Sequence, residues 1–240
     1  MEENTIVIYP NLAEAAAAAA SEIARLSAEA IAERGKFTLA LSGGSTPQEL
    51  YEILARDYKD TIDWKNVHLF WGDERYVPHN DQASNFRLVK ESLLDFIQIP
   101  AENIFPIPTD DVEPEVGAQT YAATLQSAFG ENLPTFDLIL LGLGPDGHTA
   151  SLFPGMDLEQ DADKLAIVTN APFVPPVRIS LTLAVINHAR QVFFLVSGKE
   201  KAGILREVLE SRGDAKAKYP AARVEGDVRW FVEEDAAELL

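Results

Sequence analysis

The feature that most constrains the fold of this chain is a repeated alternation between short apolar runs and segments with helical character. The apolar runs are rich in β-branched and aromatic residues, which predicts β-strands. Several of them are apolar almost throughout, as is typical of parallel strands covered by helices on both faces. The expected strands are 5–9, 37–43, 66–72, 136–142, 165–170, 177–182, 191–198 and 228–233.

The segments between these strands carry helix start and stop signals. Asn11 and Glu14 form a capping pair ahead of an alanine-rich stretch that ends at Gly35, which predicts a helix packed closely on the sheet. The sequence therefore predicts an α/β fold with a mostly parallel sheet and helices on both faces, in a single domain over residues 1–240. Further helices are expected near 47–57, 84–95, 114–128, 183–189 and 200–211, with loops over 99–114 and 171–176.

The absence of cysteine excludes several kinds of chemistry. The chain has no disulfide, no thiolate nucleophile and no Cys-containing zinc site, and its four histidines lack the short spacings of a local metal motif. The N-terminus is acidic where a signal peptide would be basic, and no apolar run approaches the length of a membrane span. We therefore expect a cytoplasmic protein without a metal site or a membrane partner.

The net charge restricts the ligands further. A formal charge of -18 repels nucleic acid and anionic lipid over most of the surface. An anionic ligand must then be small, and a few concentrated cations or backbone amides must bind it. Most of the carboxylates need no explanation beyond solubility.

The loop "LSGGSTPQEL", residues 41–50, is a first candidate for a ligand site. Gly43 and Gly44 let the backbone approach a ligand closely, and the N–H groups at the following helix start suit a phosphate. Ser45 and Thr46 add hydroxyl donors, and Thr46 is expected to cap the helix with Pro47 at its first position. A tight strand-to-helix turn without a ligand explains the same residues equally well.

The loop over 71–87 concentrates charged side chains directly after an apolar strand. Asp73 can accept hydrogen bonds from hydroxyl groups, and the Arg75 guanidinium can bind a resident or developing negative charge. The alternative is a solvated ion pair, but the position at a strand end favours a binding role. Ser84 is interpreted as the cap of a helix that begins near Asn85.

The loop "LGLGPDGHTASLFPG", residues 141–155, contains a single histidine. The unperturbed pKa of histidine lies near neutrality, so His148 at a strand end is well suited to move a proton, and Asp146 is close enough to orient it or to bind substrate. His148 as a polar cap of a short helix is the alternative. The run "GLGPDG" matches a dinucleotide fingerprint, which we exclude because no clear long helix follows and Pro154 with Gly155 interrupts the segment.

Six motifs together resemble a known family. "LSGGSTP", "GDERYVP", "SNFR", "GLGPDGHTASLFPG", "PPVRISLT" and "VSGKEKA" occur with an order and spacing similar to those of the glucosamine-6-phosphate isomerase/6-phosphogluconolactonase family. The resemblance covers nearly the whole chain and is strongest to the lactonases. It implies a Rossmann-like fold, shared with glucosamine-6-phosphate deaminases, without metal or organic cofactor. It also implies hydrolysis of a phosphorylated sugar lactone in the oxidative pentose phosphate pathway.

The resemblance implies a role for each candidate residue of the catalytic group. His148 would be the general base that activates water, and Arg75 would stabilise the oxyanion or hold the phosphate. Asp73 and Asp146 would accept sugar hydroxyls or hold His148 in place.

The resemblance likewise implies a phosphate site. Lys201 matches the family's phosphate lysine better than Lys199 does. Arg178 is a second cation, and the alternative for it is pairing with a carboxylate beside its strand. The backbone and hydroxyl groups of the phosphate site would come from Gly43, Gly44, Ser45 and Thr46. The oligomeric state is open between a monomer and a small homo-oligomer.

Two other functions share these features. Glucosamine-6-phosphate deaminases resemble the chain in the glycine turn and the loop histidine, but carry a glutamate five residues after that histidine and a tyrosine after the D-E pair. This chain has Phe153 and Arg75 there, which favours the lactonase. A sugar phosphate sensor without turnover would predict loss of His148 and gain of a basic or helix-turn-helix segment, neither of which the sequence shows.

Overall fold

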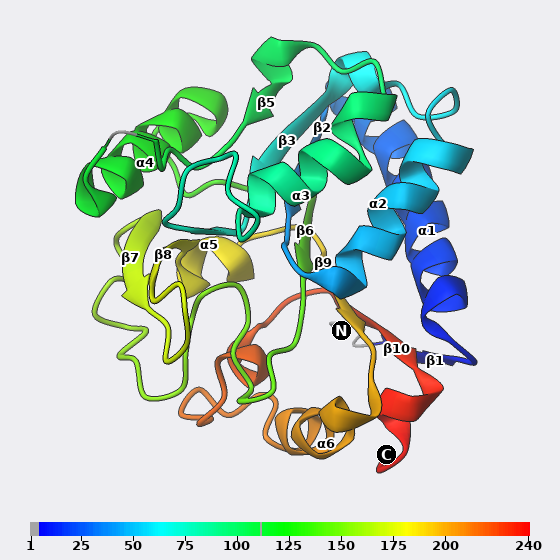
Figure 1. Cartoon of the computed structure of the whole chain (residues 1–240), viewed down its shortest axis with the longest axis vertical. Helices are drawn as coiled ribbons and strands as arrows, with labels where there is room; N and C mark the ends of the chain where they lie inside the picture. The colour runs from blue at the N-terminus through cyan, green and yellow to red at the C-terminus, as the bar shows by residue number, and fades with distance from the viewer. Residues whose placement is uncertain (1–4, 111) are drawn as a thin grey trace.

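A seven-stranded parallel sheet forms the centre of the molecule in the computed structural model, which describes residues 5–110 and 112–240 (Figure 1). All neighbouring strands of this sheet run parallel, so their carboxyl ends lie at one edge. The parallel α/β prediction is thereby confirmed. In spatial order the strands are β1 (Thr5–Tyr9), β10 (Val228–Glu233), β9 (Val192–Val196), β6 (Leu138–Leu141), β2 (Phe37–Leu41), β3 (Val67–Trp71) and β5 (Ile104–Phe105).

A separate three-stranded antiparallel sheet contains two of the expected strands. It consists of β4 (Asp73–Arg75), β8 (Val177–Leu181) and β7 (Ala166–Asn170), in that order. The sequence predicted both strands and a mostly parallel sheet, but it did not specify that these two strands form a sheet of their own. The short segment 171–176 joins β7 to β8, and a short connection permits an antiparallel hairpin but no parallel crossover. The sequence did not predict β4, which lies within an expected loop.

The helices cover both faces of the large sheet. The chain moves from β1 through β2 and β3 to β5, and then returns through β6, β9 and β10. Because parallel crossovers are right-handed, this reversal puts the early and late helices on opposite faces. Helices α1 (Leu12–Arg34), α2 (Ser45–Asp57) and α3 (Asn85–Ser92) lie on one side, and α4 (Pro114–Phe129) and α5 (Leu183–Asn187) on the other, while α6 (Ala202–Glu210) follows β9 (Figure 1).

The alanine-rich tract forms helix α1 as predicted. The Glu14 backbone N–H donates to Asn11 Oδ1 at 2.9 Å, and Gly35 ends the helix in the left-handed conformation at φ +76°. The alanines that face the sheet are almost completely buried. With no side chain beyond Cβ, they let the helix axis lie close to the strands. These alanines are Ala15, Ala16, Ala19 and Ala20.

Two buried tyrosines fix the carboxyl ends of neighbouring strands. The Tyr51 hydroxyl donates to the Ser42 carbonyl at 2.6 Å and accepts from the Ser42 N–H at 3.1 Å, just beyond β2. The Tyr121 hydroxyl does the same at Trp71, at 2.7 and 2.9 Å, at the end of β3. Both tyrosines are fully buried, and burial raises the pKa of both phenols. The strands therefore enter their loops in fixed positions.

The substitution Tyr121→Phe is expected to lower the free energy of unfolding by about 1–3 kcal/mol, because it leaves the buried N–H and carbonyl of Trp71 without their partner. Urea denaturation of wild type and variant measures this difference. Tyr58→Phe is the control, since no hydrogen bond of its hydroxyl is found in the described part of the chain. Equal denaturation midpoints for Tyr121→Phe and Tyr58→Phe would contradict a stabilising role of the hydrogen bonds between Tyr121 and Trp71.

Candidate active site

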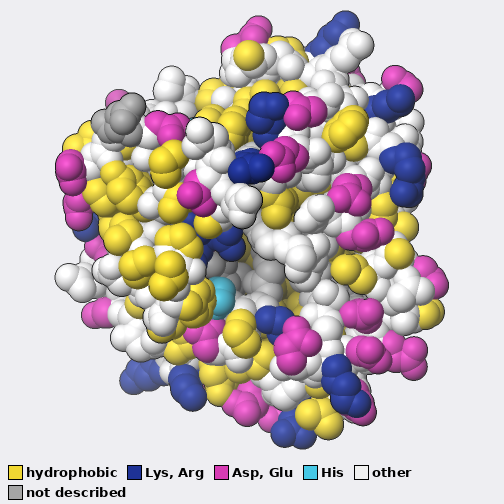
Figure 2. Space-filling view, viewed as in Figure 1, with side chains coloured by type: hydrophobic (Ala, Val, Ile, Leu, Met, Phe, Trp, Pro, Cys, Tyr) yellow, Lys and Arg dark blue, Asp and Glu magenta, His cyan; other side chains and the backbone are white. Residues whose placement is uncertain are grey.

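The carboxyl ends of β2, β6 and β9, together with the small sheet, enclose a pocket of about 530 Å³. The chain leaves β2 toward one edge of the sheet and β6 toward the other, so a topological switch point lies between these two strands. Open α/β sheets bind ligands at such a point. Figure 2 shows a hollow in this face with histidine and Lys or Arg side chains at its wall. Every predicted site residue except Asp146 lines the pocket: Gly43, Gly44, Ser45, Thr46, Asp73, Arg75, His148, Arg178 and Lys201. Below we call it the inner pocket.

Asp146 lies outside the inner pocket and orients His148. Its Oδ1 lies 2.5 Å from His148 Nδ1 and accepts the His148 backbone N–H at 3.1 Å. Because an ionised carboxylate only accepts hydrogen bonds, the proton of a neutral imidazole is assigned to Nδ1. Nε2 is then the nitrogen that can accept a proton. The imidazole packs against Phe153 and Phe173, with ring centroids 4.9 and 5.6 Å away.

Two glycines make room for this arrangement. A Cβ on Gly144 would lie 2.1 Å from atoms of the His148 ring, so any side chain there would displace the imidazole. Gly147 has φ +83°, and a Cβ there would lie 2.4 Å from the Tyr219 ring. No helix follows within 142–155, in agreement with the exclusion of a dinucleotide site. Two of the three glycines of "GLGPDG", Gly144 and Gly147, therefore accommodate a histidine and a tyrosine.

Arg75 and Arg178 are direct cross-strand partners on β4 and β8. Arg178 is 5% exposed, and its Nε donates to the Pro175 carbonyl at 2.7 Å. Arg75 Nη1 donates to the Ala83 carbonyl at 2.6 Å, and its Nε is buried without a partner among the described residues. Burial, and secondly the Arg75 charge, lower the pKa of Arg178. Like charges at opposed positions repel, so an anion in the inner pocket would be bound favourably here.

Both carboxylate oxygens of Asp73 have hydrogen-bond partners within the protein. It is 6% exposed, and its Oδ2 accepts the Ser151 hydroxyl at 2.5 Å. Its Oδ1 lies 3.4 Å from Asn85 Nδ2. Of the two roles expected for Asp73, this geometry favours holding the His148 loop in place.

The glycine turn differs in detail from the expectation. Helix α2 begins at Ser45, with Gly44 at φ +108° as its N-cap and no side-chain cap. Thr46 as the cap, with Pro47 as the first residue, was therefore wrong. The Thr46 hydroxyl instead lies 2.9 Å from the Ser197 hydroxyl on the loop after β9. The first N–H groups of α2 consequently have no side-chain acceptor, as an anion site requires.

Lys201 lines the inner pocket, whereas Lys199 does not. Both belong to the 3-10 turn Lys199–Lys201 that precedes α6, but Lys199 is 70% exposed at its side chain and pairs with Glu238 at 2.9 Å. Burial lowers the pKa of Lys201, and the charges of Glu200 and Asp146 act in the opposite direction. The structure thus separates two lysines that are close neighbours in sequence.

Glu74 supports the site from within, and sequence reasoning did not assign it a role. It is 1% exposed and accepts the backbone N–H groups of Arg75, Asn85 and Phe86, each at 2.7 Å. Glu74 thereby joins β4 to the start of α3. The predicted cap of α3 is confirmed, since Ser84 accepts the backbone N–H of the helix's third residue at 3.2 Å. The signal for Glu74 was its place between two candidate residues, but the sequence does not show that its side chain is buried.

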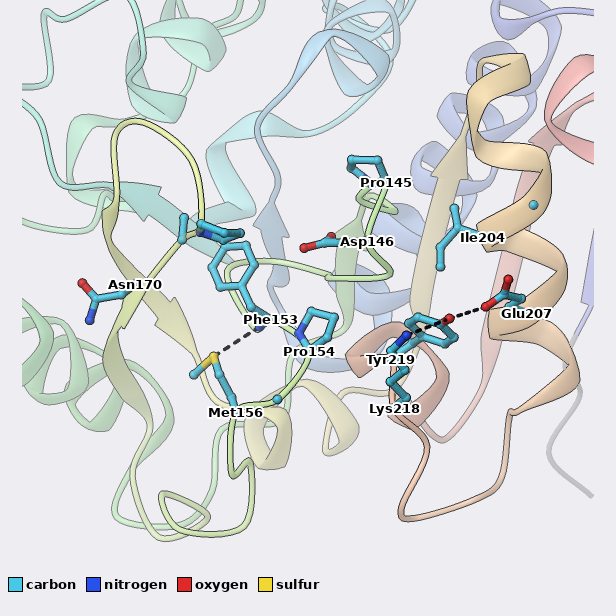
Figure 3. A pocket seen from close by; sticks show the side chains of 14 residues that line it. Pro145, Asp146, Phe153, Pro154, Met156, Asn170, Ile204, Glu207, Lys218 and Tyr219 are labelled. Atoms are coloured by element: carbon cyan, nitrogen blue, oxygen red, sulfur yellow. Dashed lines mark hydrogen bonds between the residues drawn. The ribbon is translucent and has the colours of Figure 1, made fainter.

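A second pocket of about 770 Å³ lies beside the inner pocket. Pro145 and Phe153 line both pockets, whereas Asp146, the partner of His148, lines the second one. Figure 3 shows Phe153 and Ile204 on opposite sides of this outer pocket, with Asp146 between them. The Tyr219 hydroxyl donates to the Glu207 carboxylate. His148 and the arginines do not line the outer pocket, so the chemistry is expected in the inner one.

No group of three His, Asp or Glu side chains in the described ranges is placed to hold a metal ion. The groups that come together at the inner pocket are a histidine–carboxylate pair, two arginines, a lysine and the start of a helix without a side-chain cap. The fold and site define the class of α/β proteins that hold a small anionic ligand at the carboxyl ends of parallel strands. Over residues 10–231 the chain matches the family described as glucosamine-6-phosphate isomerases/6-phosphogluconolactonase, and it belongs to that family.

Known relatives agree with this assignment. The chain is 45% identical over 217 residues to a 6-phosphogluconolactonase of Synechocystis sp., with 88% of each chain covered. The solved structure of 6-phosphogluconolactonase from Trypanosoma brucei has 30% identity and a TM-score of 0.83, with 100% of both chains covered. That from Thermotoga maritima has 33% identity and a TM-score of 0.83, covering 96% of this chain and 100% of its own.

The stability of the protein should depend on pH through Glu74. Burial raises the pKa of this carboxyl to about 7, against the opposing effect of the backbone N–H donors. Between its unfolded pKa of about 4.3 and about 7, the folded state holds a proton that the unfolded chain has released. This contribution is therefore fully present below the unfolded pKa and is lost as pH rises through about 7.

Urea denaturation of wild type and Glu74→Gln near pH 5 and near pH 8 measures this contribution, because glutamine does not titrate. The stability of wild type relative to the variant should decrease from the lower to the higher pH. A relative stability that stays constant or increases would show that the carboxyl is already ionised at the lower pH.

Proposed function

We propose that this protein hydrolyses 6-phospho-D-glucono-1,5-lactone to 6-phospho-D-gluconate, as in the oxidative pentose phosphate pathway, with His148 as general base. The observation that carries the proposal is the contact of 2.5 Å between His148 Nδ1 and Asp146 Oδ1. This contact leaves Nε2 of His148 as the nitrogen that can accept a proton, and His148 lines the inner pocket. The family membership and the relatives named 6-phosphogluconolactonase support the same activity.

In the proposed reaction His148 Nε2 takes a proton from a water molecule as that water attacks the lactone carbonyl carbon. The carbonyl electron pair moves onto oxygen, and Arg75 stabilises this oxyanion. The buried, unpartnered Nε of Arg75 supports that role. When the oxyanion re-forms the carbonyl and the ring C–O bond breaks, the His148 imidazolium returns its proton to the departing ring oxygen. The carboxylic acid that results then releases its own proton to solvent and becomes the carboxylate of the product.

The phosphate is proposed to bind at the start of α2. Gly43, Gly44, Ser45 and Thr46 line the inner pocket there, and the first turn of α2 has no side-chain cap. Lys201 adds a positive charge from the loop after β9. Arg178, on the small sheet, is the second cation of the inner pocket. Asp146, and Asp73 through Ser151, would hold the His148 loop in position.

Phe153 argues against the deaminase alternative. Its ring lies 4.9 Å from the His148 ring, at the position where the resemblance implies a glutamate in deaminases. A phenyl ring cannot transfer a proton, whereas hydrolysis of a lactone that is already cyclic needs no such group. The presence of His148 in the inner pocket likewise favours an enzyme over a sensor without turnover.

The wider context of the protein follows from the same features. We infer that residues 1–240 form one catalytic domain that acts in the cytoplasm as a monomer or small homo-oligomer, without nucleic-acid or membrane partners. The charge of -18 supports the first exclusion. None of the helices in the described ranges has the length and apolar character needed to span a membrane.

Hydrolysis of freshly generated 6-phosphogluconolactone, corrected for spontaneous opening, tests the proposal. Wild type should be fast, and His148→Ala should lose on the order of a hundredfold or more in kcat, because the base that activates water is missing. His188→Ala, which changes a histidine outside the inner pocket, is the matched control. A wild type no faster than the uncatalysed reaction would refute the lactonase activity. A His148→Ala variant as fast as wild type would refute the role of His148 as general base.

Charge reversal at Lys201 tests the phosphate site. Because most of the surface is acidic, capture of a phosphorylated lactone should depend on local cations. Lys201→Glu is expected to raise KM at least tenfold, roughly, with a smaller effect on kcat. Lys199→Glu makes the same charge change in the same turn but outside the inner pocket, and should leave KM nearly unchanged. Equal KM values for the two variants would remove Lys201 from the phosphate site.

A further inference from the structure

Asn85 contains a buried hydrogen-bond acceptor that no described protein group satisfies. It is the first residue of α3 and lines the inner pocket, but it is only 1% exposed. Its side-chain oxygen Oδ1 has no hydrogen-bond partner in the described structure. A buried carbonyl oxygen without a donor costs free energy that a ligand donor would recover.

The orientation of the Asn85 amide follows from its neighbours. Nδ2 lies 2.9 Å from the Asp73 backbone carbonyl and 3.4 Å from Asp73 Oδ1. Both of these Asp73 atoms are acceptors, so the amide must turn its NH₂ group toward Asp73. The oxygen then faces Gly43, where a Cβ would lie only 1.7 Å from it. Asn85 Oδ1 is therefore located between Asp73 and the glycine turn.

Asn85 is also held rigidly. Its backbone N–H donates to Glu74 Oε1 at 2.7 Å, and the Asp73 carboxylate that accepts from its amide is itself fixed by Ser151. A side chain that is fixed by two buried carboxylates loses little freedom when a ligand binds. The arrangement is that of a preorganised acceptor.

The chemistry of the acceptor restricts what it can bind. A carbonyl oxygen needs a donor, and an ionised phosphate or carboxylate has none. The cations of the inner pocket suit the anionic parts of a ligand, whereas Asn85 Oδ1 suits a neutral hydroxyl group. The phosphorylated lactone carries hydroxyl groups between its phosphate and its carbonyl.

We propose that Asn85 is a specificity-determining residue whose Oδ1 accepts a hydrogen bond from a ring hydroxyl of the sugar lactone. This inference rests on the proposed lactonase function. A site built to bind a hydroxyl discriminates against an analogue that lacks it, because the buried acceptor then stays unpaired. Asn85 would thus select a hydroxylated lactone from other phosphorylated esters that fit the pocket.

The test compares 6-phosphogluconolactone with its 2-deoxy, 3-deoxy and 4-deoxy analogues, each freshly generated and corrected for spontaneous opening. Wild type should show kcat/KM lower by roughly tenfold or more for one of the deoxy lactones. Asn85→Ala should be less efficient on the parent lactone and should use that deoxy lactone about as well as the parent. Asn103→Ala is the matched control, since Asn103 is a buried asparagine outside the inner pocket whose amide also donates to a backbone carbonyl.

Two results would overturn the inference. One is a wild type that uses all three deoxy lactones as well as the parent, and the other is an Asn85→Ala variant that keeps the wild-type preference against each of them. If Asn85→Ala does not fold, Asn85→Ser gives the same comparison, because its backbone N–H still reaches Glu74 while its shorter side chain withdraws the acceptor. A wild type inactive on the parent lactone refutes the proposed function instead, and with it this inference.

Discussion

Parallel pairing of β9, β6 and β2 is the constraint on which the rest of the structure depends. It brings three loops that are far apart in sequence to one edge of the sheet, where they form the inner pocket. Parallel strands need crossover helices, and these helices hold the strand ends in place through buried side chains such as Tyr51. The position of every site residue on these loops follows from that pairing.

The small antiparallel sheet supplies the two arginines at the wall of the inner pocket, beside Lys201 from the loop after β9. Pairing of β4 with β8 sets Arg75 opposite Arg178, although their like charges repel and burial lowers the pKa of Arg178. In a chain of charge -18, such a concentration of cations is where an anionic ligand is bound most favourably. The repulsion between these two like charges is thus understandable as part of a binding site.

Two carboxylates fix the geometry of the site through hydrogen bonds. Asp146 sets the imidazole of His148, and Asp73 joins the loop of His148 to α3 through Ser151 and Asn85. These hydrogen bonds leave Nε2 of the histidine and Oδ1 of the asparagine without protein partners among the described residues. The protein therefore satisfies most polar groups around the inner pocket internally and leaves a few for the ligand.

The sequence by itself determined the parallel α/β architecture, the α1 cap at Asn11 and the loop that holds His148, because periodicity, capping and strand-end motifs are local signals. The tertiary structure decided the rest. It assigned β7 and β8 to a separate sheet and gave Thr46 a partner on the loop after β9 in place of a capping role. It also buried Asn85 with an unpaired oxygen. These outcomes depend on contacts between segments far apart in the chain, which no local pattern encodes.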